Sequence, residues 1–205
     1  MNEKQRGILL VLSGPSGVGK GTVGKKLRAS DDNISFSVSV TTRGMREGET
    51  PGVDYLYITE DEFAAMEEKG KLLESALVHG KHYGTPEEPV DRQLAEGKDV
   101  LLEIDPQGAQ TVIRKRPDCV SVFVLPPSWA SLRSRLEGRG TETEEQVETR
   151  LRNAREEVKT VPMYDYVIVN ADGPEGIEKA FLSLKAIVES EKCRTTRYSG
   201  LIPEE

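Results

Sequence analysis

The chain has 205 residues, of which 31% are charged and 36% hydrophobic, and its formal net charge at pH 7 is −7. This length suits one α/β domain with small insertions, and the negative balance argues against a nucleic-acid partner bound through a broad basic face. No apolar run approaches the about 20 residues that a membrane-spanning helix requires, so we expect no membrane partner.

Cysteine usage indicates a reducing compartment. The two cysteines, Cys119 and Cys193, lie far apart and lack metal-ligand spacing, and reduced thiols are the ordinary state of such residues in the cytosol. Residues 1–6 lead straight into the first predicted strand and leave no room for a signal peptide. We therefore expect a cytoplasmic protein.

The first predicted element is a buried strand over 8–12, and a glycine-rich loop and a helix over 20–29 follow it. Gly14, Gly19 and Lys20 fill the G-x-x-x-x-G-K frame of a phosphate-binding loop. Converging backbone N–H groups, the positive end of the helix dipole and the lysine charge favour binding of a nucleoside triphosphate. The predicted ATP-binding residues of this loop are Gly14, Pro15, Ser16, Gly17, Val18, Gly19, Lys20, Gly21 and Thr22.

Position 21 departs from the usual loop. Gly21 stands where a hydroxyl residue usually ligates Mg²⁺, and Thr22 follows one place later. Because Mg²⁺ dehydrates reluctantly and keeps several waters, we expect it to be held mostly by water and phosphate oxygens. Thr22 and Asp105 would lie nearby, and no side chain is predicted as a direct ligand of this expected cofactor.

Residues 36–97 do not fit a simple strand–helix alternation. Two short alternating stretches indicate half-buried strands of a small mixed sheet, and Thr59 and Glu62 have the spacing of a capping box that opens a helix. The predicted elements here are strands over 36–40, 55–58 and 72–78 and helices over 59–68 and 87–96. We interpret this segment as an inserted acceptor-binding subdomain.

The remaining apolar runs alternate with helical patterns. They predict strands over 100–104, 120–125 and 166–169 and helices over 107–115, 128–138 and 174–190. Near-continuous apolar strands suit a parallel sheet buried on both faces, and the alternation suits βαβ units. The predicted fold is therefore an α/β fold of the P-loop NTPase type, a parallel sheet flanked by helices, with a small mixed α+β insertion and a helical lid.

Residues 128–156 hold six arginines and no lysine, namely Arg133, Arg135, Arg139, Arg150, Arg152 and Arg155. The rigid fork of arginine suits bidentate phosphate recognition, whereas six glutamates in the same stretch leave surface ion pairs as an alternative. Gly138 and Gly140 interrupt the helical pattern. We expect two helices hinged there to form a mobile lid.

Six segments in a fixed order carry a family resemblance. Besides the phosphate loop they are Ser39-Val-Thr-Thr-Arg-Gly-Met-Arg46, Gly52-Val-Asp-Tyr55, His82-Tyr-Gly-Thr85, Glu103-Ile-Asp-Pro-Gln-Gly108 and Arg135-Leu-Glu-Gly-Arg-Gly-Thr-Glu-Thr143. Together they resemble the guanylate kinase family over roughly residues 7–190. The resemblance implies transfer of the γ-phosphate of ATP to GMP, with dGMP as an expected second acceptor. His82 departs from the family, which often has tyrosine there.

The resemblance also implies residue roles. The implied GMP-binding residues are Ser39, Arg43, Arg46, Tyr55, Glu74, Tyr83, Thr85, Glu103 and Asp105, and the implied catalytic residues are Lys20, Arg43, Arg135, Arg139 and Arg150. Glu74 and Thr85 would read guanine, and Asn170 would lie near the adenine of ATP. A carboxylate such as Glu74 can accept from both adjacent donors of guanine and would repel the acceptor at N1 of adenine.

The implied domain organisation is one guanylate kinase-like domain over 7–190 and a C-terminal tail over 191–205. Within the domain we expect a core formed by 7–35, 98–127 and 160–190, a GMP-binding subdomain over 36–97 and a lid over 128–159.

Two alternatives remain at this point. One is a related kinase for another phosphorylated acceptor, and the other is a non-catalytic guanylate-kinase-like binding module. Lys20 and the lid arginines favour an enzyme, and catalysis needs no general base because the attacking phosphate oxygen is already anionic. The pattern of surface residues indicates no oligomeric state.

Overall fold

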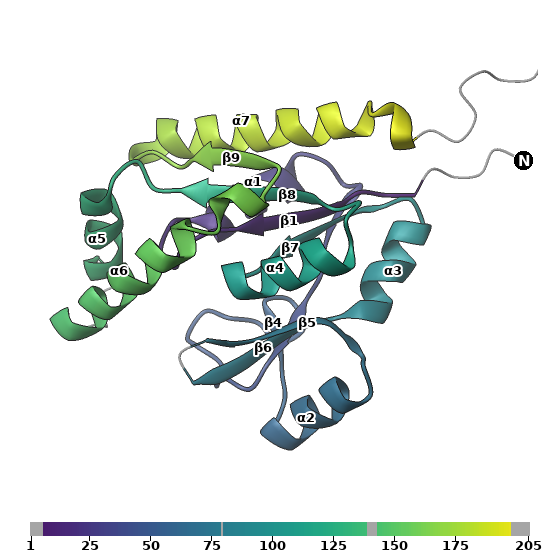
Figure 1. Ribbon diagram of the computed structural model, residues 1–205, viewed down its shortest axis with the longest axis horizontal. Helices are drawn as coiled ribbons and strands as arrows, with labels where there is room; N and C mark the ends of the chain where they lie inside the picture. Colours follow the sequence, from purple (N-terminus) through teal and green to yellow (C-terminus); the bar gives the residue numbers. More distant parts are fainter. Residues whose placement is uncertain (1–5, 79, 139–142, 198–205) are drawn as a thin grey trace, which may run out of the picture.

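A five-stranded parallel sheet forms the centre of the protein, with helices on both of its faces (Figure 1). The computed structural model describes residues 6–78, 80–138 and 143–197. The strand order is β2-β7-β1-β8-β9. The strands are β1 (Leu9–Ser13), β2 (Ile34–Phe36), β7 (Asp99–Glu103), β8 (Val120–Leu125) and β9 (Tyr166–Val169).

Strand β1 lies in the middle of this sheet, between β7 and β8, and all five of its residues are buried. Alternate side chains along a strand point to opposite faces. Leu10 and Leu12 therefore join the core cluster under α1 (Lys20–Ala29) and α7 (Gly173–Lys192). Leu9 and Val11 join the cluster under α3 (Glu87–Ala95) and α4 (Pro106–Lys115).

A second sheet of four strands, in the order β4-β3-β6-β5, lies beyond α3 and α4. Its strands are β3 (Ser39–Thr41), β4 (Tyr55–Tyr57), β5 (Leu72–Val78) and β6 (Lys81–Pro86). The β3–β4 pair is parallel and the other two pairs are antiparallel. Helix α2 (Glu60–Glu68) begins at the predicted Thr59–Glu62 capping box and packs Phe63 against Val40 and Leu72.

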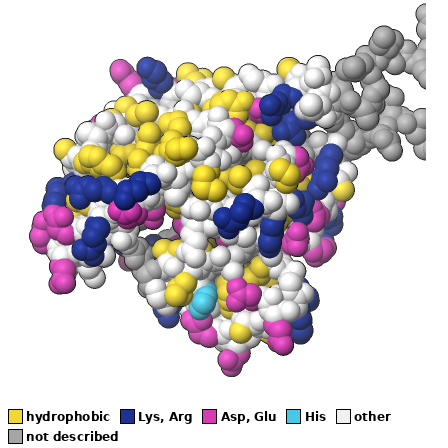
Figure 2. All heavy atoms as spheres, viewed as in Figure 1, with side chains coloured by type: hydrophobic (Ala, Val, Ile, Leu, Met, Phe, Trp, Pro, Cys, Tyr) yellow, Lys and Arg dark blue, Asp and Glu magenta, His cyan; other side chains and the backbone are white. Residues whose placement is uncertain are grey.

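Helices α5 (Trp129–Glu137) and α6 (Glu144–Val158) project from the central sheet. They share a separate apolar cluster that includes Leu136 and Leu151. The short 3₁₀ helices η1 (Val161–Met163) and η2 (Thr195–Arg197) follow α6 and α7. On the face drawn in Figure 2, Lys and Arg side chains lie interleaved with Asp and Glu side chains. None of the described helices is long and apolar enough to cross a bilayer.

Most predicted elements are confirmed, since their bounds agree with the structure to within two residues. The single strand predicted over 36–40 is wrong. Residues Ile34–Phe36 form β2, which pairs with β7 at the edge of the central sheet, and β3 begins in the small sheet at Ser39. The chain changes sheets between them because Ile34 is buried in the central core whereas Val40 packs in the small one.

The predicted boundary between the domain and the tail falls inside the last helix. Helix α7 continues to Lys192, so residue 191 does not begin a separate tail. Glu191 is 3% exposed and accepts a hydrogen bond of 2.5 Å from the Tyr166 hydroxyl. It also accepts one of 3.3 Å from Arg197. A buried carboxylate with these partners fixes the helix end against β9.

Candidate functional site

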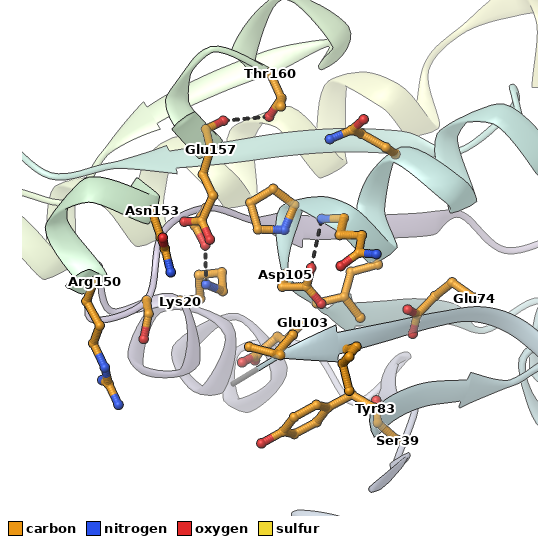
Figure 3. A pocket seen from close by; sticks show the side chains of 18 of the residues that line it. Lys20, Ser39, Glu74, Tyr83, Glu103, Asp105, Arg150, Asn153, Glu157 and Thr160 are labelled. Carbon is orange, nitrogen blue, oxygen red and sulfur yellow. Dashed lines mark hydrogen bonds between the residues drawn. The ribbon is translucent and has the colours of Figure 1, made fainter. Parts of the chain in front are cut away.

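One cavity of about 560 Å³ opens between the central sheet, the small sheet and α6. Because the strands of the central sheet are parallel, their carboxyl ends meet at one edge, where α/β proteins bind ligands. The predicted site residues that line the cavity are Gly14, Ser16, Lys20, Ser39, Arg46, Tyr55, Glu74, Tyr83, Glu103, Asp105 and Arg150. The structure thus brings residues from distant parts of the chain to one hollow (Figure 3).

The glycine-rich loop after β1 needs its glycines. Gly14, Gly17 and Gly19 have φ values of 143°, 85° and 93°, which side chains rarely adopt. A Cβ at Gly14 would also lie 2.4 Å from the carbonyl oxygen of Val124. The Lys20 ammonium donates to the carbonyl oxygens of Gly14 at 2.5 Å and Pro15 at 3.2 Å. The lysine therefore arches over the loop and faces the cavity.

Asn170 and Arg135 hydrogen-bond to this loop and are not among the residues that line the cavity. Asn170 is 3% exposed, and its Nδ2 donates to the Val18 carbonyl oxygen at 2.8 Å. Arg135 donates to the same oxygen at 3.0 Å and to the Asn170 carbonyl oxygen at 2.8 Å. Its guanidinium also pairs with Asp172 at 2.7 Å. Both side chains support the phosphate loop through these hydrogen bonds. Their positions in the sequence did not predict this geometry.

Arg43 lies beside the cavity and is held by Glu49 of its own segment and by Tyr83 of β6. Its two terminal nitrogens donate to Glu49 at 2.9 and 2.8 Å, and its Nε donates to the Tyr83 hydroxyl at 3.2 Å. Hydrogen bonds from Arg43 lower the pKa of Glu49 to about 2. The Glu49 carboxylate also accepts from the Arg46 backbone N–H at 2.8 Å. The sequence did not lead us to predict Glu49, although an acidic residue three positions after Arg46 was a usable signal.

Glu74 and Thr85 form a buried pair on adjacent strands, because Glu74 of β5 lies opposite Thr85 of β6. The Thr85 hydroxyl donates to Glu74 Oε1 at 2.6 Å. Glu74 Oε2 faces Gly108 of α4, where a Cβ would lie only 2.3 Å away. Burial raises the pKa of Glu74 to about 7, and the nearby negative charge of Asp105 adds to the rise.

Glu103 and Asp105 follow one another at the end of β7 and have different surroundings. Asp105 is the N-cap of α4, and its Oδ1 accepts from the backbone N–H groups of Gln107 at 2.7 Å and Gly108 at 3.2 Å. Glu103 lies against α1, and burial raises its pKa although Arg28 and other cations oppose the rise. The described residues contain no group of three acids, histidines or cysteines that could hold a metal by itself.

Helix α6 contributes Arg150, Asn153 and Glu157 to the cavity. Spacings of three and four residues place these side chains on one face of the helix. The carboxylate of Glu157 points toward the Lys20 ammonium (Figure 3). Burial raises the pKa of Glu157, and attraction to Lys20 opposes the rise. Asn153 and Glu157 were not predicted, although their spacing from Arg150 was a usable signal.

The remaining predicted residues that the structure describes are not among those that line the cavity. Pro15, Gly17, Val18 and Gly19 form the body of the phosphate loop. Gly21 and Thr22 are exposed in the first turn of α1. Arg139 and Gly140 lie outside the described residues, and Gly138 is the C-cap of α5.

The chain resembles known proteins over nearly its whole length. A family model described as guanylate kinase matches residues 6–191. The chain is 49% identical to the guanylate kinase of Halalkalibacterium halodurans over 195 residues, which cover 95% of this chain and 94% of the relative. It is 50% identical to that of Bacillus anthracis over 201 residues, 98% of this chain and 96% of the relative.

A solved structure agrees with these sequence relatives. The crystal structure of guanylate kinase from Anaplasma phagocytophilum has a TM-score of 0.80 and 38% identity, and the match covers 97% of this chain and 93% of that one. The family model, the curated relatives and the fold agree over the same residues that surround the cavity. On these grounds the chain belongs to the guanylate kinase family.

Proposed function

We infer that this protein is an enzyme that transfers the γ-phosphate of ATP to GMP and releases ADP and GDP. The observation that carries this function is the continuous cavity that joins the phosphate loop to Glu74, the partner of Thr85, and to Tyr55 and Tyr83 of the small sheet. A phosphotransferase must hold donor and acceptor phosphates in line within one hollow. Family membership supports the same reaction.

The phosphate loop and Lys20 are proposed to hold the ATP phosphates. The loop N–H groups precede the N-terminus of α1, whose dipole favours anions. Lys20 would turn from the carbonyl oxygens of Gly14 and Pro15 to the phosphates, because an ammonium binds a charged oxygen more strongly than a neutral one. Asn170 supports this site by donating to the Val18 carbonyl oxygen, and its place near adenine stays a prediction.

The small sheet is proposed to hold GMP. Ser39, Arg46, Tyr55 and Tyr83 line the cavity and would bind the acceptor phosphate, with Arg43 fixed beside Tyr83 by Glu49. Ionised Glu74 would accept from guanine N1–H and the amino group, and Thr85 orients that carboxylate. Glu103 and Asp105 line the same cavity and would lie between the two proposed phosphate sites.

The proposed chemistry is alignment and neutralisation of charge. The attacking group is an oxygen of the GMP phosphate, which is already anionic, so no side chain has to remove a proton. Lys20 and Arg150 face the cavity, and with Arg139 they would stabilise the transferring phosphoryl group. Arg135 would join them if the lid closure moved it from its bonds to Val18 and Asp172.

We propose Mg²⁺ as the cofactor. When bound with ATP, Mg²⁺ would neutralise charge on the β- and γ-phosphates. The donor set fits this role, because the cavity offers carboxylates of Glu103 and Asp105 but no complete cluster of ligands among the described residues. A metal that arrives with the nucleotide and keeps most of its waters suits such a site.

A coupled assay of ADP release with ATP and Mg²⁺ tests the function. GMP, dGMP, AMP, UMP and CMP are compared as acceptors, and we expect turnover with GMP and dGMP. Preference for another acceptor would support the related-kinase alternative, and no turnover with any acceptor would support the binding module.

We also propose a cytoplasmic location and a role in purine nucleotide metabolism. Cys119 and Cys193 are free thiols in the structure, as in proteins of reducing compartments. GMP and GDP are themselves purine nucleotides. Fractionation of cells that express the tagged chain tests the location.

A further inference from the structure

Glu157 is an acidic residue of α6 in a cavity that is proposed to bind phosphates. Its carboxylate points toward the ammonium of Lys20, the residue proposed to hold the ATP phosphates (Figure 3). Burial raises the pKa of Glu157, attraction to Lys20 opposes the rise, and repulsion from Asp105 adds to it. A carboxylate in such a site repels a triphosphate, so phosphate binding alone does not account for Glu157.

The charge of Lys20 accounts for it better. The Lys20 ammonium donates to the carbonyl oxygens of Gly14 at 2.5 Å and Pro15 at 3.2 Å. These oxygens carry only partial charges, and an ammonium binds a charged acceptor more strongly than a neutral one. Glu157 offers the full negative charge, because Lys20 is the cation that lowers its pKa.

Glu103, another carboxylate of the cavity, is committed to α1. Arg28 opposes the rise in the pKa of Glu103 more than Lys20 does. The Oε1 atom of Glu103 also lies so close to α1 that a Cβ at Gly24 would be 2.0 Å away. Glu103 therefore stays with the first helix, whereas Glu157 approaches the lysine from the lid.

The position of Glu157 in α6 connects the lid to the phosphate loop. The apolar residues Val147, Leu151 and Ala154 of α6 belong to the cluster that α6 shares with α5. Glu157 lies in the last turn of α6 and lines the cavity together with Lys20. The attraction between these two side chains thus holds the end of the lid helix toward the loop.

We propose that Glu157 takes the place of a phosphate at Lys20 until ATP binds, and that the ATP phosphates then take the lysine and release the end of α6. Because Glu157 and ATP compete for one cation, each weakens the binding of the other by the same factor. The inference rests on the proposed function only in that the ATP phosphates bind at the phosphate loop. It makes Glu157 a positioning residue that links donor affinity to the lid.

Calorimetric titration of the full chain with ATP and Mg²⁺ measures the donor affinity. Glu157→Gln keeps the shape but removes the charge that holds the ammonium, so ATP should bind about fivefold more tightly, the factor expected of one partly exposed ion pair. Glu156→Gln is the matched control, because Glu156 also lines the cavity but pairs with Lys159 at 2.6 Å. The control should stay within about 1.5-fold of the parent, since an exposed pair contributes little.

Amide exchange in α6 without nucleotide measures the attachment of the lid. Glu157→Gln should speed this exchange by about the same fivefold factor, because the end of the helix loses its attraction to the loop. Lys20→Met keeps the apolar stem of the lysine and should speed it as well. If the two side chains act as a pair, Lys20→Met/Glu157→Gln should exchange no faster than Lys20→Met.

Three results would overturn the proposal: ATP binding that is unchanged or weaker in Glu157→Gln, an equal gain in Glu156→Gln, or an effect of Glu157→Gln on exchange that persists in Lys20→Met. Thermal unfolding shows whether each variant folds, and Glu157→Ala serves as the second variant if Glu157→Gln does not. A parent that binds ATP but phosphorylates no acceptor in the coupled assay would instead contradict the proposed function. The two failures are therefore distinguishable.

Discussion

The Glu74 carboxyl is 3% exposed and accepts a hydrogen bond from Thr85 at 2.6 Å. Glu74→Gln keeps the shape but replaces an acceptor by an amide donor that would face a guanine donor. An unpaired buried polar group costs about 1–3 kcal/mol, and a charged partner more, so kcat/KM for GMP should fall by ~10- to 10³-fold. Steady-state kinetics with GMP and AMP measure the effect.

The same variant should leave ATP binding unchanged and narrow the discrimination against AMP, because repulsion from adenine N1 is relieved. It should also fold at least as well as the parent, since it removes a buried charge. A GMP-to-AMP ratio equal to that of the parent would place the base-reading residue elsewhere.

Glu74 also predicts a pH dependence. Burial raises its pKa to about 7, and only the ionised form can accept from both guanine donors. GMP affinity should therefore rise with pH, by about tenfold between one unit below and one unit above that pKa. Calorimetry of GMP binding across this range measures the rise.

Glu74→Gln is the control for that titration, because the phosphate of GMP itself ionises in a nearby range. The step assigned to Glu74 should be absent from the variant, and an identical pH profile in both proteins would contradict it. The stability of the fold depends on pH in the opposite direction from GMP affinity. Because the folded state holds the Glu74 proton more tightly than the unfolded chain, the contribution of Glu74 to the free energy of unfolding falls as pH rises from 4.5 to about 7.

Some features of single residues could be predicted from the sequence and others could not. The loop glycines were predictable, because only a few residue types permit such a backbone. The ion pair between Arg43 and Glu49 was not predictable, because it depends on how a polar segment folds back on itself. The brace formed by Asn170 and Val18 joins residues 152 positions apart, and no local pattern encodes such a contact.

At the scale of elements, the phosphate loop is supported by β9 and α5 as well as by its own glycines. Asn170→Ala would leave the Val18 carbonyl oxygen without its amide donor at 2.8 Å. Arg135 would still donate to that oxygen at 3.0 Å, so the variant loses one hydrogen bond, about 0.5–1.5 kcal/mol, and leaves no unpaired acceptor. We expect weaker binding of ATP and unchanged binding of GMP, both measured by calorimetry.

Binding of inorganic tripolyphosphate, which has no adenine, distinguishes the support of the loop by Asn170 from a contact between Asn170 and adenine. If Asn170 acts through the loop, the variant should lose affinity for ATP and for tripolyphosphate by the same factor. A loss with ATP alone would support the position near adenine that the resemblance implied.

The elements themselves were predictable where burial is uniform. The fully buried β1 and the nearly fully buried β8 were found from apolar runs, and α2 from its capping box. Strand β2 was missed because it has three residues, of which only Ile34 is buried. Its membership of the central sheet depends on pairing with β7, some 65 residues later, and such pairing is invisible to local periodicity.

At the scale of the whole molecule, the small sheet and the lid are attached to the core in different ways. Leu73 of β5 is fully buried in the central-sheet cluster with Leu9 and Val11, and the Lys115 ammonium donates to its carbonyl oxygen at 2.7 Å. The lid has its own cluster, which includes Leu151. The small sheet should therefore unfold with the core, and the lid should open on its own.

Leu73→Ala and Leu151→Ala test this difference as a matched pair, because both remove the same atoms from buried positions. Leu73→Ala should lower the free energy of unfolding by about 2–5 kcal/mol in a single denaturant transition. Leu151→Ala should speed amide exchange in α5 and α6 far more than it shifts the global transition. It should also lower kcat, because Arg150 of the lid lines the cavity proposed for the transferring phosphate. Faster exchange confined to the small sheet in Leu73→Ala would mean that this sheet opens independently of the core, and the acceptor site would then be the mobile part of the enzyme.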